Sequence, residues 1–427
     1  MPNTPINHPS RRDFIRTTGT VAAAAALASY TSPAFAASDT LRIGLIGCGG
    51  RGNGAAFQAL SADPNTKLVA LGDTFPDMVE ASLASLKKSG AGDRVAVDDD
   101  HKFVGFDSYK GVIAASDVVI LASPPAFRPE HIRAAIEAGK HVFCEKPIAV
   151  DGPGVRSVLE TCKLAREKKV SLVSGLCYRY QFAKQDIIKR IHDGAIGDIV
   201  AMQTTYNTGG LWHKGHDAKW SDMEYQVRNW LYFDWLSGDH INEQHIHSLD
   251  KIAWAMKNEY PAKATASGGR VVRTDAKYGN IYDHFNTAYE WANGVRCFSS
   301  CRQWENAAST DVSDHVFGTK GTARIQEHRI DFRDGTTWAH EPSGPDDMYQ
   351  NEHNALFASI RKGEPRNDEY MCHSTLMAIM ARMSAYTGES LTWDQALNSK
   401  ESLVPQKLAW GAAPERAIAM PGKTAFA

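Results

Sequence analysis

The chain has 427 residues, a length that suits two or three domains, each large enough for its own hydrophobic core. Its 47 lysine and arginine residues nearly balance 49 aspartate and glutamate residues, and the net charge of −2 gives no sign of binding to nucleic acid or to an anionic membrane. The seven cysteines show no C-x-x-C spacing, which argues against a zinc cluster and a disulfide framework. We therefore expect no structural metal and no nucleic-acid partner.

Residues 1–36 predict a targeting signal. Ser10–Ile15 reads SRRDFI, which resembles the twin-arginine export signal, and an alanine-rich, weakly apolar run follows from Thr17 to Tyr30. Ala34–Ala36 is typical of a cleavage site, so the mature chain is expected to begin near Ala37. The alternative is a disordered basic tail. A twin-arginine signal implies the export machinery as a partner and a periplasmic or otherwise exported protein, and that route carries folded proteins.

Residues 41–62 predict a dinucleotide-binding turn between a buried strand and a helix. Leu41–Ile46 is an apolar run typical of a short strand, and Gly54–Ala62 predicts the helix. Between them lies a G-x-G-x-x-G spacing, formed by Gly47, Cys48, Gly49, Gly50, Arg51 and Gly52. The first glycine allows the tight turn, the second lets the backbone approach a pyrophosphate, and the third lets helix pack on strand. The alternative is an incidental glycine-rich loop.

Asp73 decides which dinucleotide the turn favours. It ends a second apolar run, Lys67–Leu71, about 20 residues beyond the motif, where an acid binds the ribose 2′-hydroxyl. A carboxylate there repels a 2′-phosphate, so the sequence favours NAD as the cofactor over NADP. Ser123, Pro124, Glu145 and Lys146 are further candidate contacts to the cofactor, with Ser123 and Pro124 near its nicotinamide half.

Residues 37–175 alternate short apolar runs with amphipathic segments, which predicts a Rossmann NAD-binding domain with a parallel sheet buried on both faces. The expected strands are Leu41–Ile46, Leu68–Leu71, Val95–Val97, Val118–Ala122, His141–Cys144 and Ser171–Ser174. The expected helices between them include Met78–Lys88, Glu130–Ala138 and Gly154–Lys168.

Residues 176–392 predict a second α/β domain with a large, mostly antiparallel open sheet. After a helix at Ala183–Asp193, strands follow with few helices between them, and Asn293-Gly294 is a hairpin turn signal. The expected strands are Ile199–Tyr206, Ala264–Val272, His284–Trp291, Val295–Gln303, His315–Phe317 and Thr322–Gln326. Helices are expected at Asn351–Lys362 and Ser374–Tyr386, with residues 393–427 as an irregular C-terminal arm.

Lys146, Glu243 and His247 are the candidate catalytic residues. Lys146 follows a buried strand and precedes Pro147, which biases it away from helical backbone angles and aims its ammonium into the cleft at the sheet edge. Residues 242–257 fit either a strand, which would make a metal site of Glu243, His245 and His247, or a helix. Apolar residues recur at helical spacing, so we predict a helix on which Glu243 orients His247 or the substrate, with His247 as the base.

The glycine motif, the Glu145-Lys146-Pro147 strand end and the Glu243…His247 spacing together resemble the glucose–fructose oxidoreductase/inositol dehydrogenase (Gfo/Idh/MocA) family, over Leu41 to Tyr386. The resemblance implies a Rossmann domain followed by an α/β domain whose open sheet often makes oligomer contacts, and hence a homo-oligomer. It places the family's lysine on Lys146 and its acid and histidine on Glu243 and His247. The acid is commonly aspartate, so Glu243 adds a methylene group.

The resemblance implies an NAD(P)-dependent oxidoreductase that transfers hydride to or from the CH–OH carbon of a sugar, polyol or glycoside, with a tightly held cofactor. Tyr178, Arg179, Trp230, His247 and Tyr282 are the candidate substrate contacts, although such aromatic residues also serve as core residues. One alternative is a redox-assisted NAD-dependent glycoside hydrolase, a branch of relatives that shares the export signal but lacks the Glu-Lys-Pro triplet. A non-catalytic exported sugar-binding protein is the remaining alternative.

Overall fold

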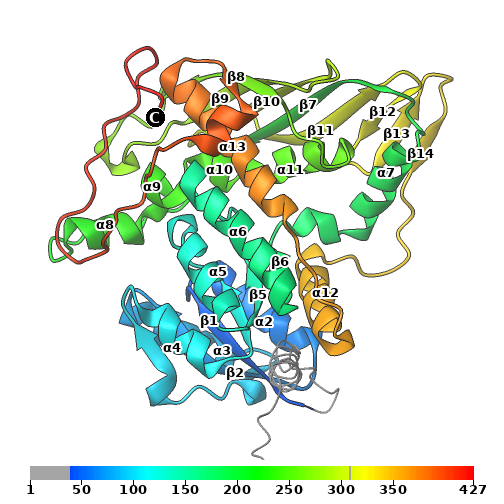
Figure 1. Cartoon of the computed structure of the whole chain (residues 1–427). Coiled ribbons are helices and arrows are strands. Elements are labelled where there is room, and N and C mark those ends of the chain that lie inside the picture. Colours follow the sequence, from blue (N-terminus) through cyan, green and yellow to red (C-terminus); the bar gives the residue numbers. More distant parts are fainter. Residues whose placement is uncertain (1–38, 307–308) are drawn as a thin grey trace, which may run out of the picture.

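The computed structural model describes residues 39–306 and 309–427 (Figure 1), so the expected signal peptide lies outside the described residues. A six-stranded parallel sheet forms the first half of the molecule, in the order β3-β2-β1-β4-β5-β6. Its strands are β1 (Leu41–Ile46), β2 (Thr66–Asp73), β3 (Lys102–Val104), β4 (Val118–Leu121), β5 (His141–Cys144) and β6 (Leu172–Ser174). Its helices are α2 (Gly50–Ala62), α3 (Pro76–Lys87), α4 (Ser108–Ala115), α5 (Arg128–Glu137) and α6 (Gly152–Lys168).

This arrangement confirms the Rossmann fold, with two local corrections. The predicted strand at Val95–Val97 is wrong: Val95 makes an isolated bridge to Leu68, and the third strand is β3, after two short 3₁₀ turns. The helix predicted from Gly54 begins at Gly50, so its N-terminus lies inside the glycine motif. Strands β1, β4 and β5 are buried along almost their whole length, as expected for a sheet covered on both faces.

A nine-stranded sheet forms the second half, in the order β14-β13-β12-β11-β7-β10-β9-β8-β15. Among the strands of residues 39–306 and 309–427, only the β7–β10 pair of this sheet is parallel, which confirms a mostly antiparallel sheet. The first strands are β7 (Ile199–Thr208), β8 (Lys263–Gly269), β9 (His284–Glu290) and β10 (Arg296–Gln303). The others are β11 (Asp311–Gly318), β12 (Gly321–Arg324), β13 (Arg329–Phe332), β14 (Thr337–Ala339) and β15 (Leu391–Thr392).

One face of this sheet is covered by helices and the other is open. Burial alternates along β9 and β10, as expected when apolar side chains point to one face. Figure 1 shows α11 and α13 beneath the sheet, and both contact its strands. The helices of this half are α7 (Phe182–His192), α8 (Asp222–Arg228), α9 (Asp234–Ser237), α10 (His240–Glu243), α11 (Ile246–Ala255), α12 (Met348–Lys362), α13 (Tyr370–Thr387) and α14 (Trp393–Asn398).

The predicted continuous helix at residues 242–257 is wrong, because the chain breaks between α10 and α11. The backbone N–H of His245 donates to His240, five residues back, and the N–H groups of His247 and Ser248 bond three residues back. The imidazole of His245 is buried and bonds the hydroxyl of Ser299 on β10, at 2.6 Å. This tertiary contact holds His245 at the break, so Glu243 and His247 lie on different helices.

The C-terminal part of the chain returns to the Rossmann half. Helix α12 packs against α2, and α13 packs against both β8 and α6. The arm after Thr392 is not irregular throughout, since α14 begins it with a capping box at Thr392. Among residues 39–306 and 309–427, no helix has the length and apolar character needed to cross a membrane.

Candidate active site

The glycine turn has the geometry that a dinucleotide requires. Gly47 has a φ of +95°, and a Cβ there would lie 2.4 Å from the backbone of Ser123. A Cβ on Gly52 would lie 1.9 Å from the carbonyl oxygen of Gly47, so strand and helix touch at this point. By contrast, a Cβ on Gly49 or Gly50 would meet no atom within 4 Å. These two glycines therefore leave open space at the N-terminus of α2, where unpaired N–H groups favour phosphate.

Asp73 lies at the carboxyl end of β2, beside the glycine turn. Its two carboxylate oxygens accept hydrogen bonds from the backbone N–H groups of Cys48, at 2.7 Å, and Phe75, at 3.0 Å. Burial raises the pKa of this carboxyl above its usual range, and these hydrogen bonds oppose the rise. Each oxygen keeps a second lone pair, so Asp73 can fix the turn and still accept a ribose hydroxyl.

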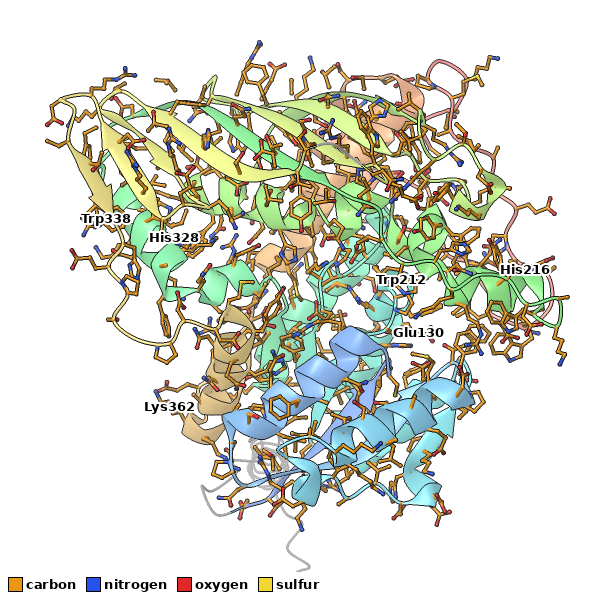
Figure 2. All side chains as sticks on the ribbon, turned by 180° about the vertical axis from the view of Figure 1, so that it is seen from behind. Glu130, Trp212, His216, His328, Trp338 and Lys362 are labelled. Carbon is orange, nitrogen blue, oxygen red and sulfur yellow. The ribbon has the colours of Figure 1, made fainter. Side chains whose placement is uncertain are left out.

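A cavity of about 670 Å³ joins the glycine turn to Asp73, and it is shared between both halves of the chain. Its volume is in the usual range of ligand sites. The predicted cofactor residues Gly47, Gly49, Gly50, Arg51, Gly52, Asp73, Ser123 and Pro124 all line it. The second half contributes Trp212, Lys214, Trp220, Val227, Arg228 and Trp230. Figure 2 shows this segment, marked by Trp212 and His216, above the helices of the Rossmann half. The residues present thus fit a dinucleotide.

Two predicted cofactor residues, Arg51 and Glu145, bind each other. The guanidinium of Arg51 donates to Glu145 at 2.5 Å and to Glu352 of α12 at 3.2 Å, and it lies 4.7 Å from the ring centroid of Tyr349. Glu145 and Glu352 are buried, and burial raises the pKa of Glu352. Arg51 lines the cavity and Glu145 does not, and the side chain of Arg51 links α2 to the residue after β5 and to α12.

Lys146 and Glu243 form a nearly buried ion pair. The ammonium of Lys146 donates to the backbone carbonyl of Glu243 at 2.6 Å and to its carboxylate at 3.0 Å. The other carboxylate oxygen accepts from the side chain of Gln244. The prediction that Glu243 orients His247 is therefore wrong, and Glu243 binds Lys146 instead. We call Lys146, Glu243 and His247 the Lys146 cluster.

His247 is a buried imidazole held in its neutral form. Burial lowers its pKa well below the usual range, and the positive charges of Lys146, Lys251 and Arg51 lower it further. Its ring stands edge-on to Tyr178, with centroids 5.3 Å apart. A neutral imidazole can accept a proton, so the environment suits a base.

Tyr178 rests on two buried lysines of the second half. The ammonium of Lys251 lies 4.4 Å from its ring centroid and that of Lys184 lies 4.7 Å from it. Lys251 forms an ion pair with Asp314, and burial beside Lys251 lowers the pKa of Lys184 to about 7. The ring of Tyr178 therefore contacts the imidazole of His247 and the ammonium groups of both lysines.

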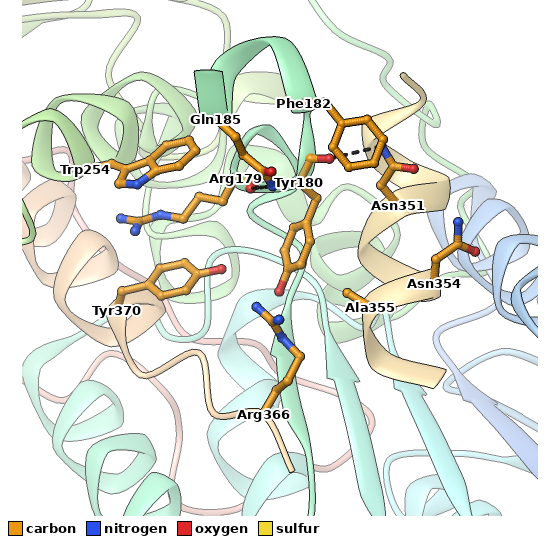
Figure 3. Close-up of a pocket in the computed structure, with 10 residues that line it drawn as sticks. All are labelled: Arg179, Tyr180, Phe182, Gln185, Trp254, Asn351, Asn354, Ala355, Arg366 and Tyr370. Carbon is orange, nitrogen blue, oxygen red and sulfur yellow. Dashed lines mark hydrogen bonds between the residues drawn. The ribbon is translucent and has the colours of Figure 1, made fainter. Parts of the chain in front are cut away.

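Two predicted substrate residues lie elsewhere. Arg179 is buried and makes a bidentate ion pair with Asp250, between the rings of Trp254 and Tyr370 (Figure 3). Tyr282 is 2% exposed, and its hydroxyl donates to the backbone carbonyl of Ala419. Both are corrected to structural residues, because their polar groups already have partners inside the fold.

Sequence reasoning missed the residues that approach the site from distant parts of the chain. Glu352 and Arg228 reach it from α12 and α8, and no local pattern marks either one. Phe75, Phe106 and Phe127 line the cavity just beyond strand or turn ends of the Rossmann half. Their positions close after predicted strands were the one feature of the sequence that could have indicated them.

The fold and the cavity define a protein with a Rossmann-type nucleotide site, and comparison with known proteins gives the family. The model of an oxidoreductase family with an NAD-binding Rossmann fold, GFO_IDH_MocA, matches residues 41–176. A model of the C-terminal domain of the same family matches residues 185–324. The chain belongs to the Gfo/Idh/MocA oxidoreductase family. A twin-arginine translocation signal matches residues 8–28, which supports export of the protein to the periplasm.

Individual relatives include dehydrogenases and a glycoside hydrolase. Inositol 2-dehydrogenase of Rhizobium meliloti is 26% identical over 335 residues, which are 76% of this chain and 90% of that protein. A glycosyl hydrolase family 109 protein of Streptomyces coelicolor is 30% identical over 225 residues, 52% of this chain and 44% of that protein. The structure of levoglucosan dehydrogenase with NADH and levoglucosan has a TM-score of 0.64 and 17% identity, over 83% of this chain and 99% of that one.

Proposed function

We propose that this protein is an exported NAD-dependent oxidoreductase that transfers hydride between nicotinamide and a hydroxyl-bearing carbon of a sugar, polyol or glycoside. The observation that carries the proposal is the single cavity in which Gly49 and Gly50 open at the N-terminus of α2 and Asp73 stands at the end of β2. Such a cavity accepts a pyrophosphate and a ribose together.

Asp73 supports NAD rather than NADP. Its carboxylate lies where the ribose 2′-hydroxyl would bind, and both of its oxygens are fixed by backbone N–H groups. A 2′-phosphate would bring a second negative charge against this carboxylate. The ion pair of Arg228 with Asp77 leaves that arginine less free to bind such a phosphate.

The Lys146 cluster supplies the proton chemistry in this proposal. An ammonium has three N–H donors, and Glu243 takes two of those of Lys146, which leaves one for a substrate oxygen. Neutral His247 takes the proton of the substrate hydroxyl, and Lys146 stabilises the negative charge that develops on its oxygen. Bound nicotinamide would supply the hydride acceptor. Glu243 positions the lysine.

The substrate class is proposed from relatives and from aromatic side chains. Relatives of this chain are named for inositol and levoglucosan. Tyr178 lies beside His247, while Trp212 and Trp230 line the cavity with ring centroids 6.1 Å apart. Aromatic faces bury the apolar face of a sugar. Because the protein is exported, we propose that the cofactor is bound before export and stays bound.

A second candidate function is redox-assisted glycoside hydrolysis. The observation in its favour is the relative named as a family 109 glycosyl hydrolase. Such an enzyme would cleave a glycosidic bond without net formation of NADH.

We also propose a homo-oligomer. The open face of the nine-stranded sheet exposes Val200 and Phe298, which are 52% and 55% exposed. Light scattering tests this directly, and a monomer at micromolar concentration would contradict it.

Mass spectrometry of the purified mature protein tests the proposed function, followed by a screen of sugars, inositols and glycosides. We expect bound NAD, an absorbance change from NADH with a sugar or polyol, and no glycoside cleavage. Cleavage without net NADH would support the second candidate. The absence of any bound or added dinucleotide, together with no turnover, would contradict both enzymatic functions.

A further inference from the structure

Beside Asp73, one segment from outside the Rossmann half forms part of the cavity wall, and a second segment packs behind that wall. We call these two segments the roof: residues 220–228, which include α8 and contribute to the cavity wall, and residues 403–416 of the C-terminal arm, which pack behind Phe75. Asp73 marks the ribose end of the proposed cofactor site, and Phe75 and Asp77 follow it on the same connection. The roof contacts both of these residues.

Arg228 is the contact made by the first part of the roof. Its guanidinium forms two hydrogen bonds of 3.0 Å with the carboxylate of Asp77, at the start of α3. The same guanidinium lies 3.9 Å from the ring centroid of Phe75 and 5.0 Å from that of Trp220. Phe75, Trp220 and Arg228 all line the cavity, so this stacked group forms a wall of it.

Trp410 is the contact made by the second part. Its ring centroid lies 5.7 Å from that of Phe75 and 4.8 Å from that of Phe106, which also lines the cavity. The ring of Phe75 is therefore contacted by both Arg228 and Trp410. Trp410 does not itself line the cavity and is 49% exposed, so it supports the two cavity-lining phenylalanines from the solvent side.

The two parts of the roof are joined to each other. The backbone N–H of Met223 in α8 donates to the carbonyl oxygen of Gly411, at 3.0 Å, and the side chain of Gln226 donates to that of Pro414, at 3.2 Å. Met223 and Val227 are buried in an apolar cluster with Phe75 and Leu403. The roof therefore behaves as one packed unit across the two halves of the protein.

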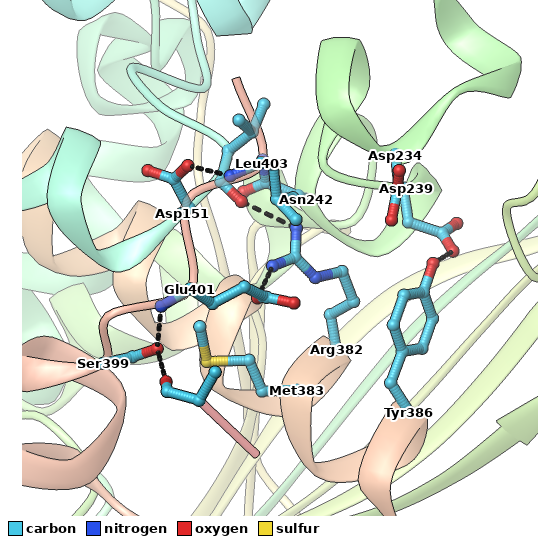
Figure 4. A network of polar contacts seen from close by, with 12 residues as sticks. Asp151, Asp234, Asp239, Asn242, Arg382, Met383, Tyr386, Ser399, Glu401 and Leu403 are labelled. Atoms are coloured by element: carbon cyan, nitrogen blue, oxygen red, sulfur yellow. Dashed lines mark hydrogen bonds and ion pairs between the residues drawn. The ribbon is translucent and has the colours of Figure 1, made fainter. Parts of the chain in front are cut away.

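The arm is anchored on both sides of Trp410. Figure 4 shows the anchor before it, where Glu401 pairs with the buried Arg382 at 3.0 Å and the N–H of Leu403 donates to Asp151 at 2.8 Å. After it, Arg416 pairs with the buried Asp234, also at 3.0 Å. These fixed ends restrict the movement of residues 404–415, because a short tethered loop has few alternative conformations.

We propose that the roof is part of the dinucleotide site: it covers the adenosine half of the cofactor and slows its exchange. This inference rests on the proposed function, since it needs a dinucleotide in the cavity. Release requires the roof to separate from Phe75, which breaks the Arg228–Asp77 pair and exposes the apolar cluster. A protein that works outside the cytoplasm gains from slow exchange, because a lost cofactor would be diluted.

Release of adenine-labelled NAD tests this. The mature protein is loaded with labelled NAD, desalted, and diluted into excess unlabelled NAD, and the label that stays on the protein is followed with time. Trp410→Ala and Arg228→Met are compared with the wild type. Trp338→Ala is the matched control, because Trp338 lies on β14, where Arg190 stacks on it far from the cavity.

We expect both roof variants to release label at least about tenfold faster than the wild type, with the same amount bound at saturation, and Trp338→Ala to match the wild type. Equal release rates in the wild type and both roof variants would overturn the roof proposal and leave the proposed function standing. A wild-type protein that binds neither NAD nor NADP would overturn both. Amide hydrogen exchange gives a second readout that needs no variant: bound NAD should slow exchange in residues 403–416, and unchanged exchange counts against the proposal.

Discussion

The nucleotide cavity and the Lys146 cluster are built in opposite ways. The cavity depends on backbone: two glycines with open space beside them, a helix N-terminus, and one carboxylate fixed by N–H groups. The Lys146 cluster depends on side chains, all nearly buried and drawn from segments 97 residues apart. A single added methyl group can disturb the cavity, whereas the Lys146 cluster depends on charges whose burial costs free energy. The proposed nucleotide site and the proposed proton-transfer residues therefore have separate structural bases, so variants should affect NAD binding and turnover separately.

Substitution of His247 should give the largest loss. His247→Gln removes the neutral imidazole, and we expect turnover to fall about 10²- to 10⁴-fold with NAD binding unchanged. The pKa of His247 is lowered, so the wild-type enzyme should keep its base form as the pH falls through 6.5. The acid limb of kcat/KM should therefore lie below pH 6.5 and vanish in the variant. An acid limb at higher pH, or full activity in the variant, would contradict this, and exposed His101→Gln is the control.

Lys146→Met should lower kcat about 10²- to 10³-fold, since it removes one donor to the developing oxyanion. It also leaves the carboxylate of Glu243 buried without its cation. The double variant Lys146→Met/Glu243→Gln is therefore needed to distinguish destabilisation by that unpaired charge from loss of the catalytic donor. We expect the double variant to regain thermal stability and to stay inactive. Recovery of activity in it would remove Lys146 from the proposed mechanism. Calorimetric titration with NAD measures binding in parallel.

Gly49 and Gly52 form a matched pair for testing the nucleotide cavity. Gly52→Ala places a methyl group 1.9 Å from the Gly47 carbonyl oxygen, so it should destabilise the protein by about 1–3 kcal/mol. Gly49→Ala points into open space, so stability should change by less than about 0.5 kcal/mol, yet NAD should bind about tenfold more weakly. Denaturant unfolding and NAD titration report the two effects. The reverse pattern would show that Gly49 does not face the ligand.

Lys184 gives the smallest expected effect, on stability. Burial lowers its pKa to about 7 from 10.5, so between these pH values the unfolded chain binds more protons than the folded one. Stability should therefore rise as the pH increases from 7 towards 10.5, and the cost of burying the charge should be complete below pH 7. Lys184→Met should flatten this slope and raise stability at pH 7 by more than about 1 kcal/mol. Urea unfolding at several pH values measures it, and an unchanged slope would exclude Lys184 as its source.

Features carried by adjacent residues could be predicted from the sequence. The glycine turn, Asp73, Ser123 and Pro124 needed only the order strand–turn–helix, and all line the cavity. The prediction of one continuous helix over residues 242–257 was wrong although the local apolar spacing is helical. The helix is interrupted because His245 bonds Ser299 of β10, 54 residues away. Arg179 and Tyr282 failed for the same kind of reason: Asp250 and Ala419, their partners, lie 71 and 137 residues away.

The sequence by itself determined the parallel sheet of the Rossmann half, the mostly antiparallel second sheet, the export signal and the chemistry of the nucleotide turn. These follow from apolar periodicity and from glycines whose backbone freedom is local. Only the tertiary structure decided that Glu243 holds Lys146 instead of His247, that Arg51 binds Glu145 and Glu352, and that α8 and the C-terminal arm cover Phe75. Long side chains choose partners by proximity in space, and burial makes an unpaired charge costly, so those partners are set by packing rather than by spacing along the chain.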